Sequence, residues 1–255
     1  MTPPHLSRRA LLAGGVAMTI IPAFGPAPAW AGSMPEQCAA PDELLIFDKP
    51  LKRVARRIEK GKYIRIVALG STSTLGGGAS GPDASYPARL QALLGHAIEG
   101  AEIKVVNKGV AKDSAVKMVD RFQADVIDTK AHMVIWETGT NDAVTRVAID
   151  DFEASLDKGI QLAQKQGIDV ILMTPMYARN TAAIIDFSPY MDDMRAVAAR
   201  HGISVFQRYE IMEHWARTGR VEFERLPKPE RTRMADQVYD CLARLLAGVI
   251  IARLK

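Results

Sequence analysis

The stretch IVALGSTSTLG (66–76) decides the fold, because an apolar run ends at a glycine and four hydroxyl residues follow directly. Uninterrupted apolar runs of this kind are typical of strands that are buried on both faces of a parallel sheet. Parallel α/β sheets bind their ligands at the carboxyl ends of the strands. We therefore expect residues 71–74 to lie at a ligand-binding edge and to include a candidate nucleophile.

The remainder of the chain alternates between strand-like and helix-like segments. Apolar runs predict strands at 63–70, 102–109, 132–139, 168–175 and 203–209. Amphipathic segments predict helices at 50–61, 85–98, 114–127, 150–167, 188–202, 210–219 and 234–254. This alternation predicts an α/β fold, a three-layer doubly wound (flavodoxin-like) domain with about five parallel strands. We expect a single domain over residues 32–255.

Composition narrows the classes of function. The chain has 255 residues, of which 48% are hydrophobic and 24% charged, and its formal net charge is +4. The lysines and arginines are spread along the chain without a dense basic block, which disfavours nucleic-acid binding. No G-x-G-x-x-G or phosphate-loop pattern follows the first strand, and no metal-ligand spacing is present. We therefore expect no cofactor and no metal.

The N-terminal segment has the pattern of an export signal. Residues 1–31 read MTPPHLSRRALLAGGVAMTIIPAFGPAPAWA, with Arg8 and Arg9 before a short apolar stretch and Ala29-Trp30-Ala31 at its end. This pattern predicts a twin-arginine signal peptide that is cleaved after Ala31, and hence a periplasmic or secreted protein. The alternative is an uncleaved anchor, but prolines interrupt the apolar stretch, which is short for a bilayer span. No later stretch is long and apolar enough to span a membrane.

The two cysteines, Cys38 and Cys241, lie near opposite ends of the mature chain. An oxidising compartment permits a disulfide between them, which would tie the mature N-terminus to the last helix. Sequence alone does not show whether two thiols so far apart meet, so a bridge and two free thiols both remain open. Two cysteines are too few for a zinc site.

Three short motifs follow the first three predicted strands: GSTST (70–74), Asn107-x-Gly109 and GTND (139–142). In order and spacing they resemble the SGNH (GDSL-type) hydrolase family of esterases and acyl hydrolases, over essentially the whole mature chain. The resemblance implies a serine nucleophile after the first strand and a histidine near the C-terminus, oriented by an aspartate three residues before it. It also implies an oxyanion hole and an acyl or acetyl ester substrate, either a small molecule or a glycan or lipid ester.

The oxyanion hole carries over by position. Gly109 matches the family glycine whose backbone N–H faces the substrate oxygen, and Asn141 matches the side-chain amide donor. Preorganised donors of this kind stabilise the charge that develops on a tetrahedral intermediate. The structural alternatives are a plain turn glycine and a plain loop asparagine.

The nucleophile position falls on a threonine. The family pattern Gly-Asp-Ser, laid on Gly70, places Ser71 on the aspartate and Thr72 on the nucleophile. A threonine hydroxyl can act as a nucleophile, although its methyl group crowds the attack. Ser71 or Ser73 would serve only if the turn were re-registered. The alternative is that the hydroxyl cluster satisfies backbone groups at a strand-to-helix turn.

The residues at the positions of the family's aspartate and histidine differ from the family pattern. The register that fits places Glu230 on the aspartate and Arg233 on the histidine, and no Asp-x-x-His occurs in the chain. An arginine stays protonated and cannot act as a base. His214 alone among the histidines is late enough to approach the crevice, and a lone helical histidine is more often structural. Lys112 stands where a second glycine is common in the family.

Two functions are consistent with these residues, an exported ester hydrolase with a rearranged nucleophile and base, and a catalytically impaired module on the same scaffold. The module would bind an anionic or carbohydrate ligand, since donors and positive charge would converge on one crevice. Alternatively, Glu230 and Arg233 form only a local salt bridge. A different ligand-binding α/β fold with a coincidental GTND is a third alternative. The residues expected in the crevice are Lys112, Asp142, Gly109, Asn141, Glu230 and Arg233.

Overall fold

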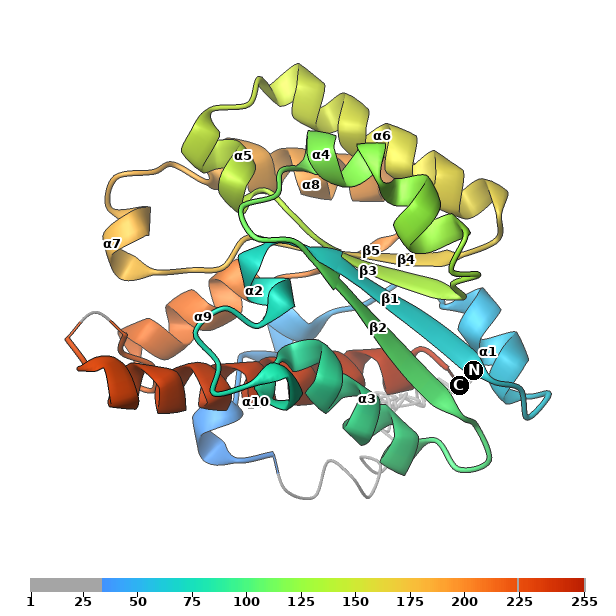
Figure 1. Cartoon of the computed structure of the whole chain (residues 1–255), viewed down its shortest axis with the longest axis horizontal. Helices are drawn as coiled ribbons and strands as arrows, with labels where there is room; N and C mark the ends of the chain where they lie inside the picture. The colour runs from blue at the N-terminus through green and yellow to red at the C-terminus, as the bar shows by residue number, and fades with distance from the viewer. Residues whose placement is uncertain (1–33, 224, 255) are drawn as a thin grey trace, which may run out of the picture. The chain divides into compact units, whose positions relative to one another are not determined.

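The structure is a computed structural model of the chain and describes residues 34–223 and 225–254. The signal peptide expected at 1–31 lies outside the described residues. The described part forms a three-layer α/β unit (Figure 1). Its central layer is a five-stranded parallel sheet with the order β2-β1-β3-β4-β5. The strands are β1 (Ile64–Gly70), β2 (Ile103–Gly109), β3 (Met133–Glu137), β4 (Asp169–Met173) and β5 (Ser204–Phe206).

The strand order places a crevice at the centre of the sheet. The chain runs from β1 to β2 on one side and then crosses to β3 on the other side of β1. In open parallel sheets, ligands bind outside the carboxyl ends of the strands at the point where the strand order reverses. That point lies between β1 and β3, so the turns that follow these two strands frame the candidate site.

Helices cover both faces of the sheet (Figure 1). Helices α4, α6 and α8 lie on one face, and α3 and α10 lie on the other. The longer helices are α1 (Lys52–Ile58), α3 (Tyr86–Ala97), α4 (Ala115–Asp120), α6 (Ile149–Lys165), α8 (Ser188–His201), α9 (Arg208–Arg217) and α10 (Lys228–Ala252). Short helices α2 (Thr72–Leu75), α5 (Thr140–Thr145) and α7 (Arg179–Ala182) follow strand ends. Single turns occupy Glu36–Cys38, Asp42–Leu45, Pro82–Ala84 and Gln123–Ile127.

The core explains why the predicted strands read as continuous apolar runs. Residues 66–69 of β1 are all buried, because helices pack against both faces of the sheet. Trp136 is one of two fully buried tryptophans among the described residues, and it lies under α6. A Cβ atom on Gly159 of α6 would be 2.4 Å from the Trp136 ring, so the glycine lets this helix approach the sheet.

The element boundaries differ from the sequence prediction in two places. The helix expected over 114–127 is divided into α4 and a π-helical turn at Gln123–Ile127. The last helix begins at Lys228 rather than near Met234, because Pro229 in its first turn has a backbone angle suited to a helix start. Glu230 and Arg233 therefore lie inside α10 and not in a loop that precedes it.

A disulfide joins Cys38 to Cys241, with their Cα atoms 4.8 Å apart. Both cysteines are buried, and the bridge links the turn Glu36–Cys38 to α10. The structure thus has the bridged form of the two that the sequence left open. Within residues 34–223 and 225–254, no helix combines the length and the hydropathy needed to cross a bilayer.

Candidate functional site

The turn after β1 exposes one of its four hydroxyl residues. Thr72 is exposed at the start of α2, whereas Ser71, Ser73 and Thr74 are buried. A nucleophile must be reachable by its substrate, so this difference selects Thr72. The two flanking serines, which the sequence left as alternative nucleophiles, are enclosed by protein.

A buried carboxylate is hydrogen-bonded to this turn and fixes its backbone. Glu137, at the end of β3, accepts hydrogen bonds from the backbone N–H of Ser71 (2.8 Å), the Ser71 hydroxyl (2.9 Å) and the Thr74 hydroxyl (3.1 Å). Arg208, at the start of α9, donates to Glu137 at 3.1 Å and to the Ser73 hydroxyl at 2.8 Å. The three buried hydroxyls are therefore structural, and they fix the backbone on either side of Thr72.

The surroundings of Glu137 and Arg208 favour the charged form of both side chains. Glu137 and Arg208 are both 0% exposed. Burial alone would raise the pKa of Glu137, but the Arg208 guanidinium and the Ser71 N–H outweigh it and hold that pKa below its usual value. Sequence reasoning missed both residues. The available signal was a glutamate at the end of the apolar run HMVIWE (132–137), where an unpaired charge would be costly.

A backbone donor lies beside the exposed hydroxyl. The N–H of Lys112 donates to Thr72 Oγ1 at 3.0 Å, across the gap between the turns that follow β1 and β2. Lys112 has φ +60°, in the left-handed region that favours glycine, at a position where the family commonly has one. The backbone group that faces Thr72 is thus supplied by Lys112.

Gly109 lies at the end of β2, as expected, and its N–H is hydrogen-bonded within the protein. Its N–H donates to Asn107 Oδ1 at 2.9 Å and is therefore engaged within its own strand end. A Cβ atom at Gly109 would lie 2.2 Å from the backbone nitrogen of Leu75. The glycine is required because β2 approaches α2 closely, and the expected oxyanion donation by Gly109 is not the contact that this structure makes.

Asn141 and Asp142 connect neighbouring loops. The Asn141 side chain is half-buried and donates to the carbonyl of Asp113 at 2.8 Å, which joins α5 to the loop after β2. Asp142 is fully buried and accepts from the backbone N–H groups of Ala115 (2.8 Å) and Gly139 (3.1 Å). Asp142 was expected to contact a ligand, and the structure gives it a supporting position instead, because its carboxylate is enclosed and hydrogen-bonded.

Glu230 and Arg233 pair with each other and are not seen to contact Thr72. Arg233 donates to Glu230 at 3.4 Å. The Arg233 side chain is 74% exposed, and the Glu230 side chain is 42% exposed. This is the local pair on one helix that the sequence left open as an alternative. An exposed ion pair at this spacing on a helix contributes about 0.3 kcal/mol to the free energy of unfolding.

The described histidines lie elsewhere. His132 precedes β3 at the amino end of the sheet, His96 is exposed on α3, and His214 on α9 contacts Arg220. His201, at the end of α8, is half-buried, and its Nε2 lies 2.6 Å from Asp157 Oδ1. No hydrogen bond joins any of these rings to Thr72 in the part of the chain that the structure describes. Nor does that part hold a group of three metal-ligating side chains.

This edge of the sheet presents an open hydroxyl and a backbone N–H 3.0 Å apart, supported by a rigid buried network. The Lys112 N–H is engaged by Thr72 Oγ1, so the Thr72 hydroxyl is the group that can donate to a carbonyl or another oxygen acceptor. Among the described residues, no side chain contacts Thr72 Oγ1 and could take its proton, which an activated nucleophile requires.

Several solved structures share this fold. One is a putative lipolytic protein of the G-D-S-L family from Desulfitobacterium hafniense, with 22% identity, 72% coverage of this chain, 98% coverage of that chain and a TM-score of 0.56. A lipase/acylhydrolase from Enterococcus faecalis has 25% identity over 75% and 97% of the two chains, with a TM-score of 0.57. An acetyl-xylooligosaccharide esterase from Geobacillus has 21% identity over 73% and 94%, with a TM-score of 0.61.

These likenesses establish an SGNH-type hydrolase fold, and they agree with the five-stranded parallel sheet described above. A comparison with curated proteins finds no significant match. The model of the non-GDSL lipase-like family matches residues 37–255, which is nearly all of the described chain. The family's name fits a turn in which serine and threonine follow Gly70 in place of the Gly-Asp-Ser pattern. The chain therefore belongs to the non-GDSL lipase-like family, on the scaffold of the SGNH hydrolases.

Proposed function

We propose that this protein is an exported ester hydrolase of low turnover, which binds an acyl or acetyl ester at the carboxyl edge of the sheet with Thr72 facing the carbonyl. The observation that carries the proposal is the contact between Lys112 N–H and Thr72 Oγ1. In this contact the Lys112 N–H is donated to Thr72 Oγ1, which holds the one exposed hydroxyl of the turn in a fixed position. Membership of a lipase-like family supports an ester as the ligand.

The reaction would join Thr72 Oγ1 to the ester carbonyl carbon and release the alcohol, and water would then release the acid. The hydroxyl proton must go to solvent water or to the substrate, since the described contacts of Thr72 include no base. In a well-studied serine protease, loss of the nucleophile or the histidine costs about a million-fold in turnover, and about a thousand- to ten-thousand-fold over water remains. We therefore expect turnover far below that of an enzyme with a complete triad, and we expect the part above background to depend on Thr72.

The direct test is hydrolysis of p-nitrophenyl acetate and butyrate by the purified protein. We expect a rate above the buffer background that falls at least about tenfold in Thr72→Ala. The matched control is Thr218→Ala, which removes an exposed threonine at the end of α9 and leaves the rate unchanged. An unchanged rate in Thr72→Ala would contradict the proposal.

A second test restores the family pattern with Thr72→Ser, Glu230→Asp and Arg233→His together. A general base contributes about a hundred- to ten-thousand-fold when it reaches its nucleophile. A gain of that size would show that the start of α10 can reach Thr72. No gain, in a variant that folds normally, would show that the alignment of Arg233 with the family histidine is wrong.

Export is part of the proposal and has a separate test. The twin-arginine pattern and Ala29-Trp30-Ala31 support secretion with cleavage after Ala31. N-terminal sequencing of the protein recovered from the periplasm or medium should begin at Gly32. Replacement of Arg8 and Arg9 by lysine should retain the precursor in the cytoplasm, and unchanged export of that variant would contradict this route.

The second candidate is a module that binds an anionic or carbohydrate ligand without turnover. It is favoured by the exposed cations Lys112 and Arg233 and by the lack of a described histidine at Thr72. The esterase assay separates the two candidates. No hydrolysis by the wild-type protein, together with binding of acetylated xylo-oligosaccharide in a calorimeter, would favour the module.

A further inference from the structure

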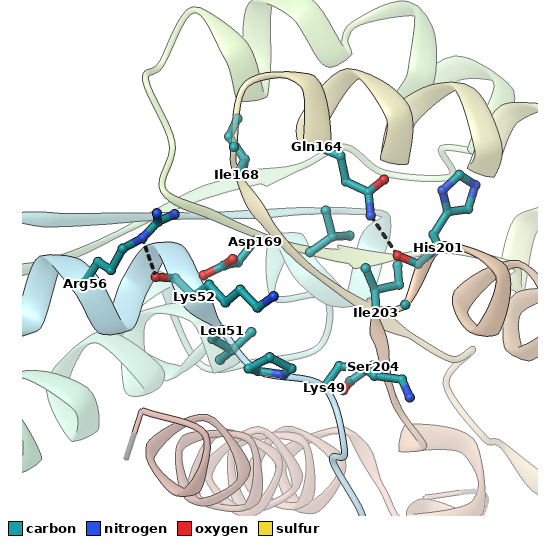
Figure 2. Close-up of a pocket in the computed structure, with 14 residues that line it drawn as sticks. Lys49, Leu51, Lys52, Arg56, Gln164, Ile168, Asp169, His201, Ile203 and Ser204 are labelled. Carbon is teal, nitrogen blue, oxygen red and sulfur yellow. Dashed lines mark hydrogen bonds between the residues drawn. The ribbon is translucent and has the colours of Figure 1, made fainter.

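A cavity of about 350 Å³ lies at the opposite edge of the sheet, away from Thr72 (Figure 2). It is formed where the start of α1 meets the amino ends of β4 and β5 and the turns that precede them. Cavities that bind small molecules have volumes of about 300–1,000 Å³. The size of this cavity therefore fits a small solute.

Positive charge on this cavity is largely unpaired. Lys49, Lys52 and Arg56 line it, and Lys49 forms an ion pair with Asp48. Lys52 and Arg56 make no ion pair with any residue in the described ranges, and the Arg56 Nε donates to the Lys52 carbonyl at 3.1 Å. In Figure 2, Lys52 and Arg56 lie near the Asp169 carboxylate, and Lys49 lies farther away, beside Ser204.

The single carboxylate of the lining is already engaged. Asp169 Oδ2 accepts the backbone N–H groups of Arg53 (2.8 Å) and Val54 (2.9 Å), so it caps α1. Burial raises the pKa of Asp169 to about 6, although the helix N–H groups and Arg56 act in the opposite direction. Asp169 therefore compensates one of the three lining cations at most.

An independent observation points to a missing oxygen partner. The Oγ of Ser204 has no hydrogen-bond partner among the described residues, and the residue is 5% exposed. A buried hydroxyl without a partner has lost its hydrogen bonds to water and gained none in return, so native structures rarely keep one. Ser204 lines the same cavity as the unpaired cations, and Figure 2 places it beside Lys49.

We propose that this cavity binds a small solute that carries a phosphate or sulfate group, with Lys52 and Arg56 holding the oxyanion and Ser204 donating a hydrogen bond to it. Tetrahedral oxyanions accept several charge-assisted hydrogen bonds at once, and arginine and lysine are their usual partners in proteins. An inorganic ion would leave much of the cavity empty, so an organic ester fits its volume better. The site is separate from the Thr72 edge, and its occupancy is independent of ester hydrolysis.

The test is calorimetric titration of the purified protein with inorganic phosphate, inorganic sulfate, glucose 6-phosphate and glucose. We expect glucose 6-phosphate to bind and glucose not to bind. Lys52→Gln with Arg56→Gln should weaken binding about tenfold or more, because two charge-assisted contacts are lost. Ser204→Ala should weaken it by about threefold or more without loss of folding, since the removed hydroxyl has no hydrogen-bond partner among the described residues.

The matched control removes two exposed cations elsewhere, Lys104→Gln with Arg231→Gln, and should leave the affinity unchanged. Thr72→Ala should bind as the wild type does. Equal weakening in the control would show general charge attraction and would overturn the proposal. Absence of binding by all four probes would also overturn it, whatever the esterase assay shows. Stronger binding of the inorganic ions than of the sugar phosphate would assign the site to a free oxyanion and overturn the organic-ester part.

Discussion

The two edges of the sheet hold their charges in opposite ways. At the carboxyl edge, Glu137 and Arg208 are fully buried and partnered, and they support the turn that exposes Thr72. At the amino edge, the exposed cations Lys52 and Arg56 line a cavity and form no ion pair among the described residues, and Asp169 is the one carboxylate of the described lining. A charge inside a protein must be compensated, whereas a charge at a rim can remain available to a ligand. We therefore expect substitutions at the first edge to affect folding and those at the second edge to affect binding.

Removal of one partner of the buried pair should have the largest effect. Arg208→Met leaves the Glu137 carboxylate without a counter-charge and removes the hydrogen bond to Ser73. We expect the free energy of unfolding to fall by about 3–5 kcal/mol. The measurement is chemical unfolding followed by circular dichroism, with Arg233→Met as the control. That control breaks an exposed pair on α10 and should cost less than about 0.5 kcal/mol.

The double variant Glu137→Leu, Arg208→Met distinguishes a buried charge from a simple loss of packing. It removes both charges, so it should cost less than the sum of the two single substitutions. Additive losses would contradict the description of Glu137 and Arg208 as a coupled pair.

A smaller effect is expected where β2 meets α2. Gly109→Ala would put a Cβ atom 2.2 Å from the backbone nitrogen of Leu75, so the turn that carries Thr72 must shift. We expect a loss of about 1–3 kcal/mol in the free energy of unfolding. Gly95→Ala on α3 is the control, because open space surrounds that position and alanine favours a helix. Equal stability of the two variants would refute the close approach at Gly109.

The fold could be predicted because local patterns determine it. Each buried strand is an apolar run, and each long helix is amphipathic or ends at a recognisable signal. The start of α10 was misjudged because its first turn, Lys228-Pro229-Glu230, is polar and has no apolar periodicity. The pattern of apolar residues begins only at Met234, six residues into the helix.

The candidate site could be predicted by position but not in detail. The hydroxyl cluster after the first strand correctly located the turn. Glu137 and Arg208 determine which hydroxyl of the turn is exposed. They are 71 residues apart in the chain and meet because both lie at the carboxyl edge of the sheet. The cavity at the amino edge likewise joins three distant segments, and no local motif marks it.

The smallest predicted effect concerns the pH dependence of stability at the amino edge. His132 accepts the Arg65 N–H on its Nδ1 at 2.8 Å, so its ring must be neutral there. Burial, and then the guanidinium groups of Arg57, Arg53 and Arg65, lower the pKa of His132 to about 4. The unfolded chain has an ordinary histidine pKa of about 6.5 and binds more protons between these values. The stabilising contribution of neutral His132 is therefore present above pH 6.5 and is lost as the pH falls toward 4.

Asp169 acts in the opposite direction over nearly the same range. Because its folded pKa is raised to about 6, the native state takes up a proton there before the unfolded state does, and acidification favours folding. We expect His132→Asn to reduce the loss of stability between about pH 7 and 4.5 by about 1 kcal/mol after allowance for solvent screening. Asp169→Asn should steepen that loss. Urea unfolding across this range measures both slopes, and identical slopes for wild type and His132→Asn would show that the cations of this edge do not act on His132. Opposite changes in the two variants would locate the acid sensitivity of the fold at the edge that carries His132 and Asp169.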